Sequence, residues 1–295
     1  MIFFNLKGPF QEYLAKERTD GKIIGFVPTM GALHQGHISL INKAKESCDL
    51  VVSSIFVNPT QFNNPSDLEK YPRTLQADMK MLENAGCDVV FAPEVSEMYT
   101  EKELQLKAMN QEDKSWMEGK TVDFGLLDKV MEGAQRPGHF NGVAQVVSKL
   151  FRIVQPDKAF FGQKDFQQLA IIRSMVKQLG MGVEIIPCPT LRESDGLAMS
   201  SRNARLSTEQ RKLVPLISQT LFKIKERVAT HTPVQLKNIV NEQFTSQPEM
   251  KLAYFEIVDT ETLQTITDFK QHKSAVACIA VELGSLRLID NVILY

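Results

Sequence analysis

Short apolar runs alternate with segments of helical periodicity through the first 189 residues, and this alternation restricts the possible folds more than any other feature. Runs that are apolar on both faces suit strands inside a parallel sheet, because crossover helices cover such a sheet on both sides. We therefore predict an α/β fold with a doubly wound, Rossmann-like parallel sheet over residues 1–189. Its strands are expected at Ile23–Val27, Leu50–Val57, Asp88–Ala92, Ala159–Phe161 and Val183–Ile186.

Four apolar stripes between and after these runs repeat at the spacing of one helix face. They predict helices around residues 38–44, 75–82, 143–154 and 169–179. Gly86 follows the second stripe, Pro156 the third and Gly180 the fourth, and both residue types commonly end helices. These helices would form the two layers that cover the sheet.

The pattern changes near residue 190, after Pro187 and Pro189. Ser207 and Gln210 form a capping box, which predicts a long helix to about residue 228. Thr232, followed by proline, predicts the start of a second helix. With strand-like runs at 253–258, 275–283 and 286–289, residues 190–295 are predicted to form a smaller C-terminal α+β domain.

The composition is that of an ordinary soluble globular protein, with 43% hydrophobic and 23% charged residues. A formal net charge of -1 argues against nucleic-acid binding through a basic surface. No apolar run approaches the ~18 residues of a membrane span, and no leader is apparent, so we expect a cytoplasmic protein without membrane contact. The four cysteines lack metal-ligand spacing and are expected to be buried apolar residues.

The stretch from Thr100 to Lys120 is rich in Glu, Lys, Gln and Met and has no glycine or proline before Gly119. Such a composition is typical of a solvated helix or a mobile insertion, and less so of a partner-binding site. The stretch nevertheless contains Trp116, the only tryptophan of the chain.

Two of the five histidines, His34 and His37, lie directly after the first predicted strand. A loop that leaves a parallel strand and enters a helix presents free amides and the positive end of the helix, which together suit a phosphate. Gly31 and Gly36 would allow close approach, so both imidazoles could point toward one phosphate. The Walker pattern is absent, and a metal site is disfavoured because no cysteine or acidic ligand is nearby.

The four residues HQGH resemble the HIGH signature of the nucleotidyltransferase superfamily, which class I aminoacyl-tRNA synthetases share. That superfamily has a second signature, a loop with Lys or Ser near the end of the nucleotide domain, and Met199–Asn203 occupies the matching place. Hydroxyls and a guanidinium suit the β- and γ-phosphates of a nucleotide. In isolation, the run SSRN would predict only a turn or a helix cap.

The chain also resembles the pantoate–β-alanine ligase family from Ile23 to Asn291. The blocks that carry this resemblance are PTMGALHQGH, FVNPTQF, YPRT, EGAQRPGHFNGV, FGQKDFQQL, DGLAMSSRN and RLIDN. The resemblance implies a carbon–nitrogen ligase of pantothenate and coenzyme A biosynthesis. Pantoate would react with ATP to give pantoyl adenylate and pyrophosphate, and β-alanine would then displace AMP. The family also implies magnesium, a homodimer and a C-terminal domain that acts as a lid.

The same resemblance implies roles for residues of these blocks. His34, His37 and Lys164 would be catalytic, because their donors can stabilise charge around the α-phosphate. Lys164 and Asp165 follow a strand, where they can reach phosphate and ribose oxygens. Besides these four, the residues expected to bind ATP are Met30, Gly31, Ala32, Leu33, Gln35, Gly36, Gly162, Gln163, Leu191, Met199, Ser200, Ser201 and Arg202.

Pantoate and β-alanine would bind to a second group of residues. The amides of Gln61 and Gln168 can both donate to and accept from a hydroxy acid. The other members of this group are expected to be Asn58, Arg136 and His139. One further residue, Asp78, matches an acidic position near magnesium in the family, but it could equally be a solvated residue of its helix.

The resemblance is weakest over Thr100–Gly125, which appears longer than in other members of the family. It could alter the cover of the active site or a subunit contact. Three other functions are also considered: a nucleotidyltransferase that stops at the nucleotidylated product, an RNA-directed synthetase, and an ATP-binding module without catalysis. The RNA function is disfavoured because the chain has no evident anticodon module and no basic surface.

Overall fold

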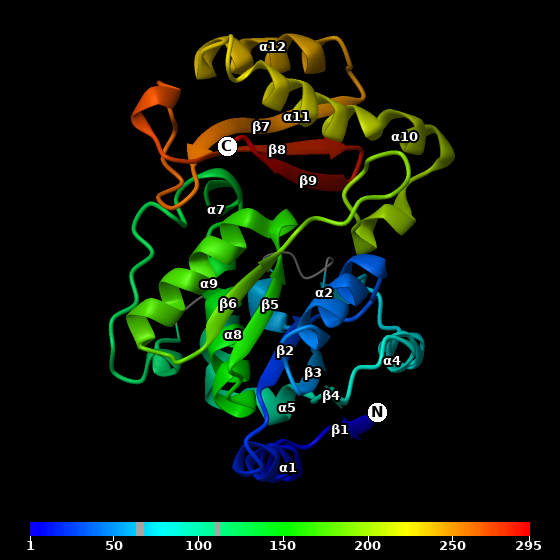
Figure 1. Ribbon diagram of the computed structural model, residues 1–295, viewed down its shortest axis with the longest axis vertical. Coiled ribbons are helices and arrows are strands. Elements are labelled where there is room, and N and C mark those ends of the chain that lie inside the picture. Colours follow the sequence, from blue (N-terminus) through cyan, green and yellow to red (C-terminus); the bar gives the residue numbers. More distant parts are fainter. Residues whose placement is uncertain (63–67, 110–112) are drawn as a thin grey trace.

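The computed structural model describes residues 1–62, 68–109 and 113–295, and it contains two β-sheets (Figure 1). A six-stranded sheet with its helices forms the larger part of the molecule, and a three-stranded sheet with two long helices lies beyond one end of it. Within the described part of the chain, no helix has the length and apolar character needed to cross a membrane.

The six-stranded sheet is entirely parallel, in the order β1-β4-β3-β2-β5-β6. This topology confirms the α/β, doubly wound prediction. Each of the five strands expected from the sequence is present within a few residues of its predicted bounds. The strands are β1 (Ile2–Phe4), β2 (Ile24–Thr29), β3 (Leu50–Ile55), β4 (Val89–Phe91), β5 (Lys158–Gly162) and β6 (Glu184–Cys188).

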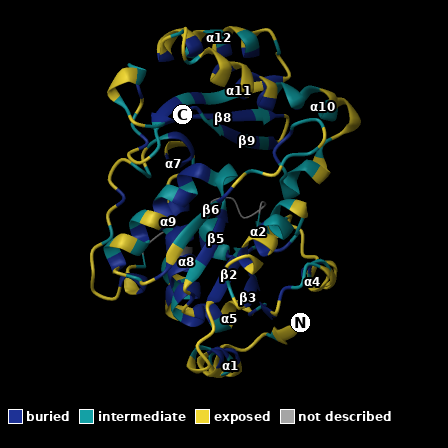
Figure 2. Cartoon of the chain, in the orientation of Figure 1, coloured by how far each residue is buried: buried dark blue, intermediate teal, exposed yellow. Residues whose placement is uncertain are grey.

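Helices cover both faces of this sheet, and the central strands are buried between them (Figure 2). One face packs against α1 (Lys7–Thr19), α8 (His139–Val154) and α9 (Phe166–Leu179). The other face packs against α2 (Gln35–Lys45) and α4 (Leu75–Asn84). The apolar stripes predicted these helices, except α1, because each stripe faces the sheet.

Strand β2 is the point at which the order of the strands reverses. It pairs with β3 on one side and with β5 on the other, so the chain leaves β2 and β5 in opposite directions across the sheet. In doubly wound sheets, ligands bind beyond the carboxyl ends of the strands at such a switch point. The loop with His34 and His37 follows β2, and the loop with Lys164 follows β5.

The C-terminal part is an antiparallel sheet with helices on one face. Its strands are β7 (Met250–Asp259), β8 (Ala275–Leu283) and β9 (Leu286–Ile293), and α11 (Pro215–Arg227) and α12 (Pro233–Thr245) cover one side. The other side packs against Met131 and Phe166 of the larger part. The predicted boundary at residues 189 and 190 lies just after β6, and it stays a prediction.

Both predicted capping boxes are present, at Ser207 with Gln210 and at Thr232 with Gln235. The single helix expected from Ser207 to about residue 228 is wrong, because the chain forms α10 (Thr208–Leu213) and then α11. Pro215 explains the break: it has no amide hydrogen to continue the helical ladder, but it suits the first turn of a new helix.

The expectation of a solvated helix or a mobile insertion over Thr100–Lys120 holds only in part for its described residues. After α5 (Val95–Met98), the chain forms α6 (Glu101–Ala108), whose first two residues are exposed, and then a 3-10 turn, η2 (Ser115–Met117), which is mostly buried. Trp116 is only 4% exposed and belongs to the main core. Residues 110–112 of this stretch lie outside the described residues, so nothing is said of them.

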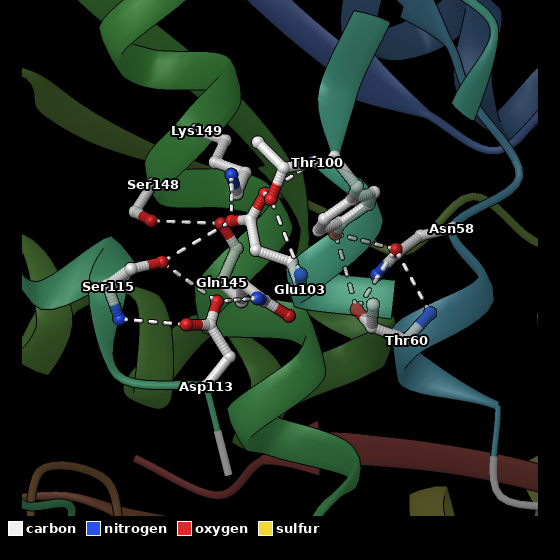
Figure 3. Close-up of polar contacts among 10 residues, drawn as sticks. Asn58, Thr60, Thr100, Glu103, Asp113, Ser115, Gln145, Ser148 and Lys149 are labelled. Carbon is white, nitrogen blue, oxygen red and sulfur yellow. Dashed lines mark hydrogen bonds and ion pairs between the residues drawn. The ribbon is translucent and has the colours of Figure 1, made fainter. Parts of the chain in front are cut away.

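The polar residues of this segment are used for packing against α8, which explains why its composition suggested solvent exposure. The Glu103 carboxylate pairs with Lys149, at 2.5 Å, and the Gln145 amide donates to Asp113, at 2.6 Å (Figure 3). Lys149 and Gln145 both belong to α8. Because α8 is buried on nearly all sides, it needs this additional cover.

Candidate active site

One large pocket of about 270 Å³ lies beyond the carboxyl ends of β2 and β5. It brings together most of the residues predicted from the sequence to form the site. Those that line it are Met30, His34, Gly36, His37, Asn58, Gln61, Arg136, His139, Gly162, Lys164, Asp165, Gln168, Leu191, Met199, Ser200, Ser201 and Arg202. Six predicted residues do not line it: Gly31, Ala32, Leu33, Gln35, Asp78 and Gln163.

His34 and His37 form a reciprocal cap at the start of α2. The Gly36 amide donates to His34 Nδ1 at 3.1 Å, and the His34 amide donates to His37 Nδ1 at 3.2 Å. A neutral imidazole has one acceptor nitrogen and one donor nitrogen. Since Nδ1 accepts in both rings, these hydrogen bonds assign the proton to Nε2. Both histidines therefore line the pocket as neutral hydrogen-bond donors.

Burial keeps these two imidazoles neutral. Desolvation, with a smaller contribution from the nearby Lys164 ammonium, lowers the pKa of His34 to about 4. Desolvation, with smaller contributions from His34 and Lys164, lowers the pKa of His37 to about 3. At neutral pH, the positive charge at this end of the pocket therefore comes from Lys164 and from the end of the helix, not from the histidines.

The loop between β2 and α2 uses its backbone amides internally. The amides of Ala32 and Leu33 donate to the Asp78 carboxylate at 3.0 and 2.8 Å, and the Gly31 amide donates to Thr29 Oγ1. The His37 and Ile38 amides donate to the His34 carbonyl. The amides expected to cradle a phosphate are thus already satisfied, and the imidazole Nε2 groups extend the donor surface of the helix into the pocket.

Asp78, on α4, acts as a support for this loop. Its two oxygens accept from Ala32, Leu33 and the Thr74 hydroxyl, and the residue is 2% exposed. Among the described residues, no group of three or more His, Cys, Asp or Glu side chains could hold a metal ion. Asp78 does not line the large pocket, but with Met30 and Gly31 it lines a neighbouring cavity, so its role as a magnesium ligand stays a prediction.

Lys164 and Asp165 enter the pocket from η3 (Gln163–Asp165), the 3-10 turn between β5 and α9. Asp165 takes the N-cap position of α9, but its side chain makes no capping hydrogen bond. Its carboxylate has no hydrogen-bond partner among the described residues and can accept from a ligand. Gln163 contributes only its backbone carbonyl to the contacts around the turn, and its side chain does not line the pocket.

The run SSRN forms both a helix cap and a wall of the pocket. Ser200 Oγ accepts from the Arg202 amide at 3.3 Å and so caps η4 (Ser201–Arg205), as an isolated SSRN would predict. Ser200, Ser201 and Arg202 also line the pocket. Asn203 anchors the turn by donating to Glu193 and to the Ala198 carbonyl.

Gln61 lines the pocket from η1 (Pro59–Gln61), the turn after β3, and a buried network holds it. The Asn58 amide donates to Gln61 Oε1 at 3.1 Å and to the Gly142 carbonyl of α8 at 3.2 Å. The Tyr99 hydroxyl donates to Asn58 Oδ1 at 2.8 Å, beside Thr60 (Figure 3). Asn58 is 1% exposed, so it positions Gln61 more than it faces a ligand.

His139 has the opposite tautomer from His34 and His37. Its Nδ1 lies 3.0 Å from the Gln61 carbonyl, which can only accept, so Nδ1 carries the proton and Nε2 is an acceptor. Desolvation and the nearby Arg136 guanidinium lower its pKa to about 4. The pocket thus contains two imidazole donors on one side and an imidazole acceptor on another.

Sequence reasoning missed several lining residues, including four on α8 and one in the block YPRT. Four apolar residues of α8 line the pocket although their stripe was taken only as core: Val143, Val146, Val147 and Leu150. Tyr71, in the block YPRT, also lines it, and burial raises the pKa of its hydroxyl. A second cavity of about 140 Å³ adjoins the first and shares Arg136, His139, Lys164 and Arg202 with it. Its place in the block YPRT was the only signal that the sequence gave for Tyr71.

Paired imidazoles at the first helix, with a lysine and a Ser-Ser-Arg turn in the same pocket at the switch point, define an α/β nucleotidyltransferase class of enzyme. The profile of the pantoate-beta-alanine ligase family matches residues 3–293, and the chain belongs to this family. It is therefore an ATP-dependent ligase of pantoate and β-alanine.

Similar proteins match this chain over nearly its whole length. A pantothenate synthetase from Porphyromonas gingivalis is 50% identical over 292 residues, which is 99% of each chain. The crystal structure of pantothenate synthetase from Thermus thermophilus has a TM-score of 0.88 and 39% identity, with all of both chains covered. A Francisella tularensis pantoate-beta-alanine ligase, solved with beta-gamma ATP and beta-alanine, has a TM-score of 0.72 and 33% identity, with 100% of this chain and 98% of that chain covered.

Proposed function

We propose that the large pocket performs both steps of the ligation, adenylation of pantoate and transfer of the pantoyl group to β-alanine. One observation carries this proposal: His34, His37, Lys164 and the Ser200–Arg202 turn line the same pocket as Gln61 and Gln168. The hydrogen-bond donors and cations of the first group suit a triphosphate. The side-chain amides of Gln61 and Gln168 can both donate to and accept from the hydroxyls and carboxylate of a hydroxy acid.

In the first step, a pantoate carboxylate oxygen attacks the α-phosphorus of ATP. A carbon–oxygen–phosphorus anhydride forms, and the bond from the α-phosphorus to the bridging oxygen of pyrophosphate breaks. The Nε2 donors of His34 and His37 would stabilise the charge that develops on the α-phosphate oxygens. Lys164 and Arg202 would neutralise the departing pyrophosphate, because both are cations on the pocket wall.

In the second step, the β-alanine amine attacks the pantoyl carbonyl, the amide bond forms, and AMP departs with the electrons of the broken anhydride bond. The amine must lose a proton during this step. His139 Nε2 is an acceptor at the place where the two cavities join, so it is suited to accept a hydrogen bond from the amine or from a pantoate hydroxyl. Arg136, beside it, suits the β-alanine carboxylate.

Magnesium stays a prediction for this chain. The ion would neutralise the ATP phosphates, and Asp78, the expected ligand, also accepts hydrogen bonds from the loop between β2 and α2. A homodimer, a cytoplasmic location and lid closure by the C-terminal part also stay predictions. Light scattering of the purified chain would test the homodimer, and cell fractionation would test the location. Small-angle scattering with and without ATP would test lid closure.

The proposal is tested by exchange of labelled pyrophosphate into ATP, with and without pantoate, followed by release of AMP when β-alanine is added. We expect exchange only with pantoate, and AMP only after both substrates are present. Exchange without pantoate would contradict the first step. A nucleotidyltransferase that stops at its product would show exchange without amine-dependent release of AMP, and an ATP-binding module would show neither.

His37→Ala tests the role of the imidazole donors directly. Removal of one such donor typically slows the chemical step by about 10²–10³-fold, so we expect pyrophosphate exchange to fall by that factor. The far-ultraviolet circular dichroism spectrum and the melting temperature show whether the fold is retained. Exchange at the wild-type rate in a folded His37→Ala variant would remove His37 from the mechanism.

A further inference from the structure

The block RLIDN, at residues 287–291, contributes three polar residues to β9 in the C-terminal sheet. None of them lines the large pocket, and none has a role in the two steps above. Asp290 and Asn291 are nevertheless buried, at 3% and 6% exposure, and both make hydrogen bonds to segments that line the pocket. Buried polar groups with such well-paired partners usually fix a local geometry.

Asn291 holds the turn that carries Lys164. Its side-chain nitrogen donates to the Gln163 carbonyl at 2.9 Å and to the Lys164 carbonyl at 2.8 Å. An amide NH₂ group has two hydrogens, so both are used on two successive carbonyls of η3. Without this pair, the two carbonyls would lose their partner, and the backbone from which the Lys164 side chain extends would have fewer restraints.

Asp290 holds the segment that leads to the Ser200–Arg202 turn. Its carboxylate accepts from Arg192 Nη1 at 2.6 Å and from Nη2 at 3.0 Å, a bidentate pair. Arg192 also donates to the carbonyls of Asn291 and Gly196. Arg192 pairs with Ala198 in an antiparallel bridge, and the Met199 amide donates to the Leu191 carbonyl.

Two adjacent residues of β9 are therefore bonded, directly or through Arg192, to the two segments that carry Lys164 and the Ser200–Arg202 turn. Asn291 contacts the Lys164 turn of the parallel sheet, and Asp290, through Arg192, contacts the segment that ends in Ser200 and Arg202. The two residues are themselves linked, because the backbone amide of Asn291 donates to Asp290 Oδ1 at 2.8 Å. Any change in the position of this strand would change the spacing between the Lys164 ammonium and the Arg202 guanidinium.

We propose that Asp290 and Asn291 are positioning residues that set this spacing, so that Lys164 and the Ser200–Arg202 turn engage one triphosphate together. The proposal rests on the phosphate-binding role proposed above for Lys164. Both residues line the second cavity and not the large pocket, so their effect on the nucleotide is exerted through Lys164 and Arg192. Nucleotide affinity, more than the binding of β-alanine, is the property that they control.

The test measures the Kd of β,γ-methylene ATP by calorimetry in a double-mutant cycle of Asn291→Ala and Lys164→Ala. Loss of two backbone restraints should weaken binding about tenfold when Lys164 is present. In the Lys164→Ala background, Asn291→Ala should weaken binding by less than about twofold, because the positioned group is gone. In steady-state assays of Asn291→Ala, the KM for ATP should rise while the KM for β-alanine stays within about twofold.

A control distinguishes this effect from general destabilisation of the C-terminal sheet. Lys237→Ala removes the pair between Lys237 and Glu256 in the same part of the molecule, without contact to η3. It should leave the Kd unchanged. If Asn291→Ala does not fold, as judged by circular dichroism, Asn291→Ser replaces it, because serine keeps one donor and is expected to give a smaller loss in the same cycle.

Three outcomes would overturn the proposal, and they separate it from the role of Lys164. Unchanged binding in Asn291→Ala would exclude positioning. An equal loss in both backgrounds would show a general structural effect. If Lys164→Ala alone does not weaken binding, the phosphate role of Lys164 fails, and the positioning proposal fails with it.

Discussion

At the scale of single residues, the site depends on which nitrogen of each imidazole carries its proton. The reciprocal cap fixes His34 and His37 as donors at Nε2, whereas the hydrogen bond from His139 to Gln61 leaves Nε2 of that ring as an acceptor. Three neutral histidines thereby provide different functions in one pocket. A neutral donor suits a developing phosphoryl charge because it adds a hydrogen bond without requiring a charge to be buried.

The lowered histidine pKa values predict that the folded chain loses stability in mild acid. Below pH 6.5 the unfolded chain binds protons that buried His37 cannot accept until about pH 3, so the free energy of unfolding falls as the pH falls through this window. The slope is at most about 1.4 kcal/mol per pH unit for each such imidazole. Urea unfolding of the wild type and of His37→Asn between pH 7 and 5 measures it, and the variant should show the shallower dependence.

Identical pH dependence in the two proteins would contradict the buried, neutral state of His37. Titration of ¹⁵N-labelled histidine by NMR provides an independent measurement, because it follows the imidazoles one by one. His34 and His139 should remain neutral down to about pH 5, since burial lowers the pKa of each to about 4.

The resemblance implied that HQGH, GQKD and SSRN act on one nucleotide, and residues of all three blocks line the same pocket. The sequence could not predict how the loop amides are used, since this depends on Asp78, 46 residues away from Ala32. Nor could it predict the tautomers, which follow from hydrogen bonds formed only in the folded chain. Tyr99, which fixes Asn58, gave no signal for the same reason.

At the scale of elements, the position of Gln61 depends on the close approach of α8 to η1. Gly142 of α8 lies against the backbone of this turn, and a Cβ added there would lie 2.6 Å from the Thr60 carbonyl oxygen and 2.8 Å from Gln61 Cα. These contacts are to backbone, which cannot rotate away. The glycine is therefore required for the pocket wall that carries Gln61, the amide predicted to bind pantoate.

Gly142→Ala should displace Gln61 and raise the KM for pantoate, with a loss of stability of about 1–3 kcal/mol from overpacking. Gly182→Ala is a matched control, since nothing lies within 4 Å of the added Cβ, and it should leave the KM unchanged. Steady-state kinetics and urea unfolding measure the two effects. A wild-type KM for pantoate in Gly142→Ala would show that Gln61 is not held by this contact.

Most elements were predictable because their apolar stripes and caps are local signals. The exceptions are instructive. Strand β1 has three residues at the edge of the sheet, two of them well exposed, so it lacks the apolar run of a buried strand. The break at Pro215 was missed because the apolar stripe continues across it. The segment around Trp116 was misinterpreted because its polar residues find partners on α8 that the local sequence does not show.

At the scale of the whole molecule, the two sheets are joined by charged contacts around the pockets. Arg287 of β9 donates to the Glu132 carboxylate of α7 (Met131–Gln135), with contacts of 2.6 and 3.1 Å. Glu132 is 7% exposed, so this pair is largely shielded from solvent. Removal of one partner of such a pair leaves a buried charge without compensation.

Arg287→Ala should therefore lower the free energy of unfolding by about 3–5 kcal/mol, and the same change combined with Glu132→Gln should lower it less. Lys212→Ala, which breaks the exposed pair with Glu209, should change stability by less than about 1 kcal/mol. Urea unfolding monitored by fluorescence of Trp116 measures all three. With Glu132→Gln measured alone as well, a loss in the double variant equal to the sum of the two single losses would show that the two charges are not coupled.

The internal use of the amides between β2 and α2 also affects how this enzyme can diversify. In a glycine-rich phosphate cradle, affinity is built into the path of the backbone, which few substitutions can adjust. Here the groups predicted to reach a nucleotide are side chains on a loop most of whose amides already have partners. Substitution of one of these side chains can therefore change the affinity for the nucleotide without changing the path of the main chain.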